Sequence, residues 1–277
     1  MTTPLVSAAL PLPCVPAVYA CLSDARLPAP LFCCGQVSSV LDVAHSVAAA
    51  GALPPWSSVI ARQQGAGRGQ MRRVWASPEG NIYAALRLPL CAPFASTAAA
   101  PAVGALLVQA LQQVCESPLA LKWPNDIVAV QGEGCAKLGG ILLEERAGVL
   151  LAGVGINVLS CPPPEQLRKD AAMPAISLCK LVHKSTFSFD FSALQELWLM
   201  LVHYAFSAYN KPRSYADHWK EAAESRLLWR GRSVMLDDDG ALVRGTLLGL
   251  GDQGGLLLGM GGQVSEFLSG SLRLCRS

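Results

Sequence analysis

Several patterns are absent from this sequence of 277 residues, and each absence excludes a class of protein. Charged residues make up only 15% of the chain and balance to +2, so no strong electrostatic field attracts it to nucleic acid. The proline-broken N-terminal region lacks the basic start and continuous apolar stretch of a signal peptide. Elsewhere, charge or proline interrupts each apolar stretch before the roughly 18 to 20 residues that a bilayer crossing needs. We expect a soluble globular protein with no nucleic-acid or membrane partner.

Cysteine is not scarce, but paired cysteine motifs are. The ten cysteines are scattered, no Cys-x-x-Cys motif occurs, and only Cys33 and Cys34 are adjacent. Free thiols in a reducing cytoplasm are the expected state. The four histidines stand far apart in the chain, which argues against a dedicated zinc site. We therefore expect a cytoplasmic protein in which each histidine is structural, namely His45, His183, His203 and His218.

The order of predicted elements indicates a large domain followed by a small one. Apolar residues at helical spacing predict helices from Ser38 or Ser39 to about Gly51, and at about 97–115, 191–209 and 215–224. Strand-like runs occur at 58–61, 81–88, 120–123, 127–130, 140–144 and 150–158. Beyond Gly231, short strands of period two alternate with turn signals. This last pattern predicts a small β-barrel, which would need to pack against the larger domain because its own core is small.

Residues 64–75 form a stretch rich in glycine and arginine, without an apolar period. Its glycines allow the backbone to approach a ligand closely, and the guanidinium groups of Arg68, Arg72 and Arg73 suit phosphate or carboxylate oxygens. The Gly-Lys-Ser/Thr ending of a Walker loop is missing, as is the glycine spacing of a dinucleotide-binding fold. On composition alone, an anion-binding loop and a solvent-exposed loop that binds nothing are equally good interpretations.

Two further motifs place polar side chains in unusual settings. Residues 122–126 are Lys-Trp-Pro-Asn-Asp, where the proline would present Asn125 and Asp126 at a fixed angle, and Lys137 lies one hairpin away. Residues 153–157 are Gly-Val-Gly-Ile-Asn, and glycines within an apolar strand indicate close backbone approach. Each motif also has a plainer interpretation. The first would be a turn beside a solvated lysine, and the second a buried strand with a bulge.

Taken in this order, the three motifs resemble those of the biotin protein ligase family. The family's Gly-Arg-Gly loop, which ends in Trp-x-Ser-Pro, is similar to residues 67–78, and its Lys-Trp-Pro-Asn-Asp is present unchanged. Its Lys-Leu-x-Gly-Ile-Leu and Gly-x-Gly-Ile-Asn elements match residues 137–142 and 153–157. The resemblance covers nearly all of the chain after residue 36, and it reduces the plainer interpretations to a minor alternative.

The resemblance implies an α+β fold, in which a mixed β-sheet is backed by helices as in class II synthetases and in biotin and lipoate ligases. It implies three parts: an N-terminal extension packed on the catalytic domain (1–35), the catalytic domain (36–229) and an SH3-like β-barrel (230–277). Related ligases often dimerise through an exposed sheet edge, which leaves a homodimer open.

The activity that the resemblance implies is a two-step biotinylation. Biotin's carboxylate attacks the α-phosphate of ATP to give biotinyl-5′-AMP, and a lysine of a biotin carboxyl carrier protein then takes the biotinyl group. Mg²⁺ is expected as the ATP complex, without dedicated protein ligands. The acceptor would belong to acetyl-CoA carboxylase or another biotin-dependent carboxylase.

The resemblance also assigns roles to individual residues. The predicted catalytic residues are Arg68 and Lys137, which would hold the carboxylate and the α-phosphate, and Asp126, which would orient the acceptor lysine or accept its proton. The residues predicted to bind biotin are Ser38, Ser39, Gln64, Gly67, Arg68, Lys137 and Gly140. The residues predicted to bind ATP are Arg68, Arg72, Arg73, Trp75, Asn125, Lys137 and Asn157.

Two departures from the family pattern keep other functions open. Gln70 stands where the family has a second arginine, and residues 270–273 lack the glutamate of the family's C-terminal motif. One alternative is a lipoate or octanoate ligase or transferase, which shares the fold. Another is a catalytically weakened protein that binds biotin or its carrier without turnover. The complete Lys-Trp-Pro-Asn-Asp and Gly-Arg-Gly elements favour biotin ligation.

Overall fold

The computed structural model describes residues 6–7, 15–23, 29–167, 173–182, 190–211 and 213–275, and for residues 6, 7 and 72 it describes the backbone alone. Two sequence predictions fall outside these limits: the structural role of His183 and the anion-binding role of the Arg72 side chain. The described residues form two β-sheets of unequal size and four α-helices.

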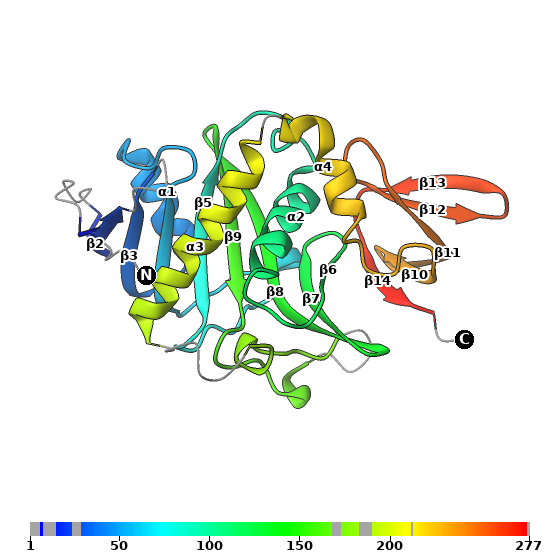
Figure 1. Cartoon of the computed structure of the whole chain (residues 1–277), viewed down its shortest axis with the longest axis horizontal. Helices are drawn as coiled ribbons and strands as arrows, with labels where there is room; N and C mark the ends of the chain where they lie inside the picture. The colour runs from blue at the N-terminus through cyan, green and yellow to red at the C-terminus, as the bar shows by residue number, and fades with distance from the viewer. Residues whose placement is uncertain are drawn as a thin grey trace.

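The larger sheet has nine strands in the order β1-β2-β3-β4-β5-β9-β8-β7-β6 (Figure 1). Within the described chain, β3 and β4 pair in parallel and the other neighbours are antiparallel, so the sheet is mixed as predicted. Its strands are β1 (Val6–Ser7), β2 (Val18–Ser23), β3 (Leu31–Val37), β4 (Ser58–Gln64), β5 (Ile82–Leu88), β6 (Leu119–Lys122), β7 (Asp126–Gln131), β8 (Gly134–Arg146) and β9 (Val149–Ile156).

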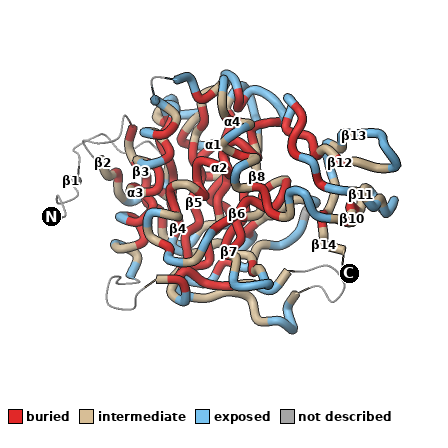
Figure 2. The backbone as a smooth tube through the Cα atoms, turned by 45° about the vertical axis from the view of Figure 1, so that its right-hand side comes forward, coloured by how far each residue is buried: buried red, intermediate tan, exposed pale blue. Residues whose placement is uncertain are grey.

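Helices cover both faces of this sheet. α2 (Ala99–Leu111) and α3 (Phe191–Tyr209) share a core with Ile60, whereas α1 (Val40–Ala49) packs with Val59 and Ala61 on the other face. Successive residues of β4 point to opposite faces, so this one strand contributes to both cores. α4 (Tyr215–Glu224) follows α3 and contacts α2. Buried residues are concentrated in the sheet and the helices beside it (Figure 2). None of the helices in the described ranges combines the length and hydropathy that a membrane crossing requires.

The first strands of the larger sheet come from the region predicted to be an N-terminal extension. β2 and the start of β3 lie before residue 36, and the predicted boundary at residue 35 falls within β3. Leu31, Cys33 and Cys34 of β3 are fully buried. The cysteines within the described ranges are all free thiols.

A smaller antiparallel sheet follows α4, with the strand order β13-β12-β11-β10-β14. Its strands are β10 (Ser233–Asp238), β11 (Ala241–Leu250), β12 (Leu256–Met260), β13 (Gln263–Phe267) and β14 (Ser271–Leu274). Two-residue turns with positive φ join β10 to β11, at Asp239 and Gly240, and β12 to β13, at Gly261 and Gly262. These are the hairpin geometries that the turn signals predict. The region predicted as a barrel is therefore an antiparallel sheet in which β13 and β14 form the two edges.

The connection between β11 and β12 joins the smaller sheet to the larger one. Trp123 donates its indole N–H to the carbonyl oxygen of Gly254 at 3.0 Å, and this bond is buried. The backbone N–H of Leu250 donates to Glu224 of α4 at 2.8 Å, and Lys220 pairs with Asp252 at 2.8 Å. Because Trp123 belongs to the Lys-Trp-Pro-Asn-Asp motif, the smaller sheet is fixed directly to a predicted site element.

Substituting Gly254 by alanine is expected to destabilise the protein by about 1–3 kcal/mol, as overpacking does in cores. Gly254 has a φ of +81°, and a Cβ there would lie 2.6 Å from the Cα of Ala98. Gly240→Ala is the matched control, since Gly240 has a φ of +90° but no atom within 4 Å of such a Cβ. Urea unfolding of the two variants separates the clash from the φ strain. Equal stabilities would contradict the predicted contact.

Candidate active site

A cavity of about 490 Å³ is lined by residues of both sheets. Its walls come from the start of α1, the loop after β4, the turn between β6 and β7, strands β8 and β9, and the start of β14. The predicted site residues that line it are Ser39, Gln64, Arg68, Arg73, Trp75, Asn125, Asp126, Lys137, Gly140 and Asn157. The two cations predicted to act together, Arg68 and Lys137, therefore share one cavity.

Paired residues of strands β7, β8 and β9 form part of the floor of this cavity. Asp126 of β7 pairs with Gly140 of β8, and Gly140 pairs with Gly155 of β9. The two glycines leave room for the indole of Trp75, because a Cβ at Gly155 would lie 2.6 Å from the ring and one at Gly140 would lie 3.1 Å from it. The close approach that the glycine motif predicts is thus made by a tryptophan side chain.

Two lysines flank Asp126 at this end of the cavity. The Nζ of Lys137 lies 2.6 Å from Asp126 Oδ1, and the Nζ of Lys122 lies 3.8 Å from Asp126 Oδ2. Lys137 also lies 5.2 Å from the centre of the Trp75 ring, a cation–π distance. One carboxylate between two ammonium groups leaves a net positive charge, which favours an anion.

The two asparagines predicted to bind ATP donate to the backbone around this cluster. Asn125 Nδ2 donates to the carbonyl oxygen of Ile141 at 2.6 Å. Asn157 Nδ2 donates to the carbonyl oxygens of Lys137 at 3.4 Å and Ile176 at 3.3 Å. Both side chains line the cavity, and their described contacts hold in place the strand that carries Lys137.

Gln64 bridges the loop and the start of α1. Its Oε1 accepts the N–H of Val40 at 2.9 Å, and its Nε2 donates to Ser77 Oγ at 3.0 Å. Ser39 is the N-cap residue and makes no side-chain cap bond, and Gln64 satisfies the N–H of Val40, the first residue of the helix. Ser38, which does not line the cavity, accepts the N–H of Ala66 through its carbonyl oxygen at 2.8 Å.

The loop after β4 has a paired base and an exposed tip. At the base, Trp75 donates its N–H to the carbonyl oxygen of Gly67 at 2.9 Å, and Gly69 donates to Arg73 at 2.8 Å. Gly67 is not a lining residue, and a Cβ there would lie 2.4 Å from the carbonyl oxygen of Trp75. At the tip, Met71 is 72% exposed. The base is thus held by its own backbone bonds, whereas the tip is solvated.

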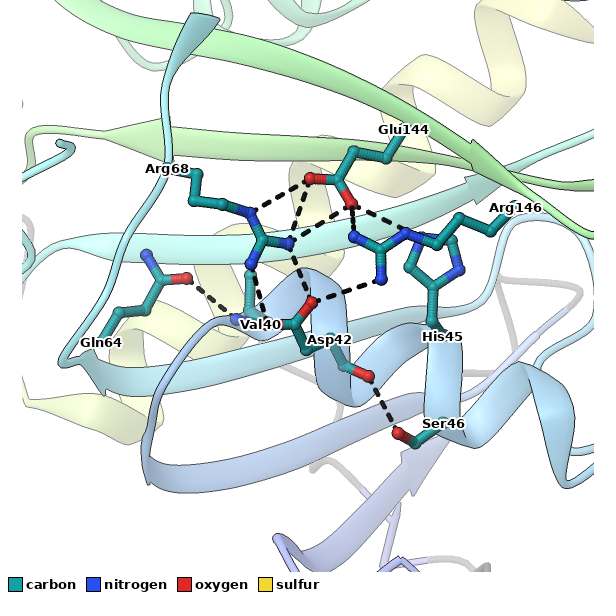
Figure 3. A network of polar contacts seen from close by, with 8 residues as sticks. All are labelled: Val40, Asp42, His45, Ser46, Gln64, Arg68, Glu144 and Arg146. Carbon is teal, nitrogen blue, oxygen red and sulfur yellow. Dashed lines mark hydrogen bonds and ion pairs between the residues drawn. The ribbon is translucent and has the colours of Figure 1, made fainter. Parts of the chain in front are cut away.

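Arg68 lies in a network of charged side chains that its motif does not reveal (Figure 3). Its two terminal nitrogens donate to both oxygens of Asp42, at 2.8 and 2.9 Å, and its Nε donates to Glu144 at 3.2 Å. Arg146 contacts the same two carboxylates, at 3.5 Å for Asp42 and 2.7 Å for Glu144. The hydrogen bonds that Arg68 donates to Asp42 hold the pKa of Asp42 below its usual value, and the same bonds raise the pKa of Arg68.

His45 at the edge of this network is expected to make stability depend on pH. Burial is the main cause that lowers the pKa of His45 from 6.5, followed by the charge of Arg146 and, more weakly, that of Arg68. The carboxylates of Glu144 and Asp42 oppose this shift. Its Nε2 is buried without a hydrogen-bond partner and lies 3.7 Å from Glu144 Oε2. Below pH 6.5 the unfolded chain therefore binds this proton more readily than the folded chain does.

The expected result is a stability that is full above pH 6.5 and falls as the pH drops from there through the lowered pKa of His45. Replacing His45 by glutamine should flatten this decline. Thermal unfolding measured across this pH range in both proteins tests it, and equal slopes would contradict it.

Comparison with known proteins finds ligases of biotin, or of biotin and lipoate, both by sequence and by structure. A model of the biotin/lipoate A/B protein ligase family matches residues 37–159. The bifunctional ligase/repressor BirA of Bacillus spizizenii is 30% identical over 242 residues, which cover 77% of this chain and 69% of that protein. A biotin–[acetyl-CoA-carboxylase] ligase of Paracoccus denitrificans is 35% identical over 124 residues, covering 42% of this chain and 50% of that protein. The biotin protein ligase of Aquifex aeolicus in complex with biotin and ATP superposes with a TM-score of 0.69 at 28% identity, covering 89% of this chain and 99% of that one.

The fold of this chain, a mixed sheet backed by helices with a small antiparallel sheet after it, is therefore similar to that of the Aquifex aeolicus ligase. The chain belongs to the biotin/lipoate A/B protein ligase family, and within it to the biotin protein ligases. It is a ligase.

Proposed function

We propose that this ligase activates biotin with ATP to biotinyl-5′-AMP and then transfers the biotinyl group to a lysine of a biotin carboxyl carrier protein. The observation that carries the proposal is one cavity with two kinds of wall. Trp75 over Gly140 and Gly155 gives a flat apolar surface for a ring, and Lys137 beside Asp126 gives a cationic end. The volume of about 490 Å³ lies within the range of roughly 300–1,000 Å³ for small-molecule sites.

The first step brings a carboxylate onto a nucleotide of like charge, so it depends on positive groups that offset the repulsion. Lys137 is the residue we assign to the reacting carboxylate and the α-phosphate, since its cluster retains a net positive charge. Mg²⁺ would enter with ATP and neutralise charge on the departing pyrophosphate.

The second step needs an acceptor amine that has lost its proton. We propose that Asp126 orients this amine or accepts its proton, which its position in the cavity wall, 2.6 Å from the Nζ of Lys137, supports. We propose that the biotin side of the site is formed by Ser38, Ser39, Gln64, Gly67 and Gly140.

The nucleotide side includes Arg72, Arg73, Asn125 and Asn157. Arg73, Asn125 and Asn157 line the same cavity as Lys137, which supports this assignment. Trp75 lies between the two sides, because its ring contacts Gly140 and approaches the Nζ of Lys137.

The acceptor we propose is the carrier protein of acetyl-CoA carboxylase or of another biotin-dependent carboxylase, the kind of substrate named for the Paracoccus relative. We place the reaction in the cytoplasm. Free cysteines in the described ranges support this location, because a reducing compartment keeps thiols unpaired.

Biotin-dependent exchange of pyrophosphate into ATP tests the proposal, because exchange reports formation of the adenylate without any acceptor. We expect exchange with biotin and little with lipoate or octanoate. Exchange with a plain acyl acid in place of biotin would indicate a lipoate or octanoate enzyme. No exchange with any acid, together with measurable biotin binding, would indicate a protein without turnover.

A further inference from the structure

The guanidinium of Arg68 has most of its donors engaged before any ligand arrives. An arginine side chain has five N–H groups. The Nε–H donates to Glu144, one N–H of Nη1 donates to Asp42, and Nη2 donates to both Asp42 and Glu144. Among the described contacts, one N–H on Nη1 is left for a ligand. A bidentate pair to one carboxylate plus a second carboxylate is a strongly fixed position for a side chain.

The charges of this network cancel. Asp42 and Glu144 balance Arg68 and Arg146, so the network adds little net positive field to the cavity. The cluster around Lys137 differs, because it has two ammonium groups for one carboxylate. Charge therefore favours Lys137 over Arg68 as the group that holds an anion.

Fixing Arg68 also fixes the base of the loop. Arg68 lies between Gly67, which accepts the N–H of Trp75, and Gly69, which donates to Arg73. Arg68 itself bridges to Val74 in antiparallel fashion. Its carboxylate partners come from elsewhere in the fold, Asp42 from the first turn of α1 and Glu144 from β8. Figure 3 shows the three side chains converging from these separate segments.

We infer that Asp42 and Glu144 are positioning residues, which hold Arg68 so that the loop base and Trp75 are already in place in the free enzyme. This inference rests on the proposed function, because the ligand that benefits is biotin bound against Trp75. A loop ordered in advance loses less conformational entropy when the ligand binds, so affinity rises without a change in the chemistry. Loss of the network should then raise the KM for biotin and leave kcat nearly unchanged.

Asp42→Asn tests the inference, with Arg146→Gln as the matched control. Arg146 contacts the same two carboxylates but lies on β8, and its ion pairs among the described residues are with Asp42 and Glu144, outside the loop. We expect Asp42→Asn to raise the KM for biotin in pyrophosphate exchange by about tenfold, with kcat within about twofold of the wild-type value. Arg146→Gln should leave both parameters near the wild-type values. Glu144→Gln is the second variant, and it should resemble Asp42→Asn.

Amide hydrogen exchange of the ligand-free protein gives a readout that does not depend on turnover. The backbone N–H groups of Gly69 and Trp75 are bonded within the loop base, and that of Ala66 is bonded to the carbonyl oxygen of Ser38, so the three report the order of the loop. In Asp42→Asn they should exchange roughly tenfold faster than in the wild type or in Arg146→Gln, while core amides stay protected.

Three results would overturn the inference. Unchanged loop exchange in both Asp42→Asn and Glu144→Gln would show that the network does not order the loop. A lower KM for biotin in Asp42→Asn would mean that the carboxylate competes with the ligand for Arg68. A fall in kcat at unchanged KM would make Arg68 a charge that acts in the reaction itself. Absence of biotin-dependent exchange in the wild type would instead reject the proposed function, and the loop amides would still report on the network.

Discussion

Replacing Lys137 by methionine is expected to lower biotin-dependent pyrophosphate exchange by about 10²- to 10³-fold, the loss typical of removing one charge-stabilising group from a transition state. Methionine keeps the apolar length of the side chain, so the packing against Trp75 is largely retained. The ammonium group beside Asp126 is what disappears. Because the charge is needed most as the carboxylate meets the α-phosphate, kcat should fall more than the affinity for biotin.

Lys122→Met is the matched comparison for this experiment. Both lysines approach Asp126, Lys137 at 2.6 Å and Lys122 at 3.8 Å, so the two variants remove the same charge from the same cluster. If position decides the effect, Lys137→Met loses far more activity, and Lys137→Arg restores part of it. Exchange by Lys137→Met within about fivefold of the wild-type rate would contradict the assignment, since one such group is normally worth far more.

Local sequence patterns predicted much of the fold. The two helices after the larger sheet coincide with the predicted ranges, at Phe191–Tyr209 and Tyr215–Glu224. The first of them is capped by Asp190, whose side chain accepts the N–H of Ala193. A long apolar face and a capping residue are both readable from neighbouring residues, so no tertiary information is needed.

The strands β2 and β3 were missed for the opposite reason. Prolines dominate the preceding region and break up its apolar residues, so no strand was predicted there. β3 pairs in parallel with β4, with Leu31 opposite Ser58, and the helix α1 lies between the two strands in the chain. Such pairing is fixed by tertiary packing, which a local pattern does not encode.

The candidate site was also predicted only in part: its motifs were found from the sequence, but the contacts between distant segments were not. Glycines in a strand motif indicated close approach, but not that Trp75 would be the group that approaches. The sequence did not predict that Asp42 and Glu144 contact Arg68, because they lie 26 and 76 residues away from it. An isolated carboxylate on a helix or strand has no distinctive spacing. Motifs identify groups that are close in sequence, whereas the network around Arg68 exists only once three distant segments have packed.

Gly155→Ala is expected to raise the KM for biotin by at least about tenfold, equivalent to roughly 1.4 kcal/mol of binding free energy. A Cβ at this position would lie 2.6 to 2.7 Å from three atoms of the Trp75 indole, and the strand backbone on its other side is fixed by pairing with β5 and β8. The ring must therefore move, and because it lines the cavity, its movement changes the shape of the cavity. Overpacking of this kind also costs about 1–3 kcal/mol of stability.

Gly35→Ala provides the control, because Gly35 also lies in a strand of the larger sheet but a Cβ there would meet no atom within 4 Å. Kinetics of exchange and urea unfolding should be measured for both variants and for the double variant Gly155→Ala with Trp75→Phe. The smaller ring removes the atoms nearest to the added methyl group, so the double variant should bind biotin better than Gly155→Ala alone. If the KM of Gly155→Ala equals that of Gly35→Ala, the indole does not form the wall against which the ring of biotin binds, and the two-walled cavity loses its apolar side.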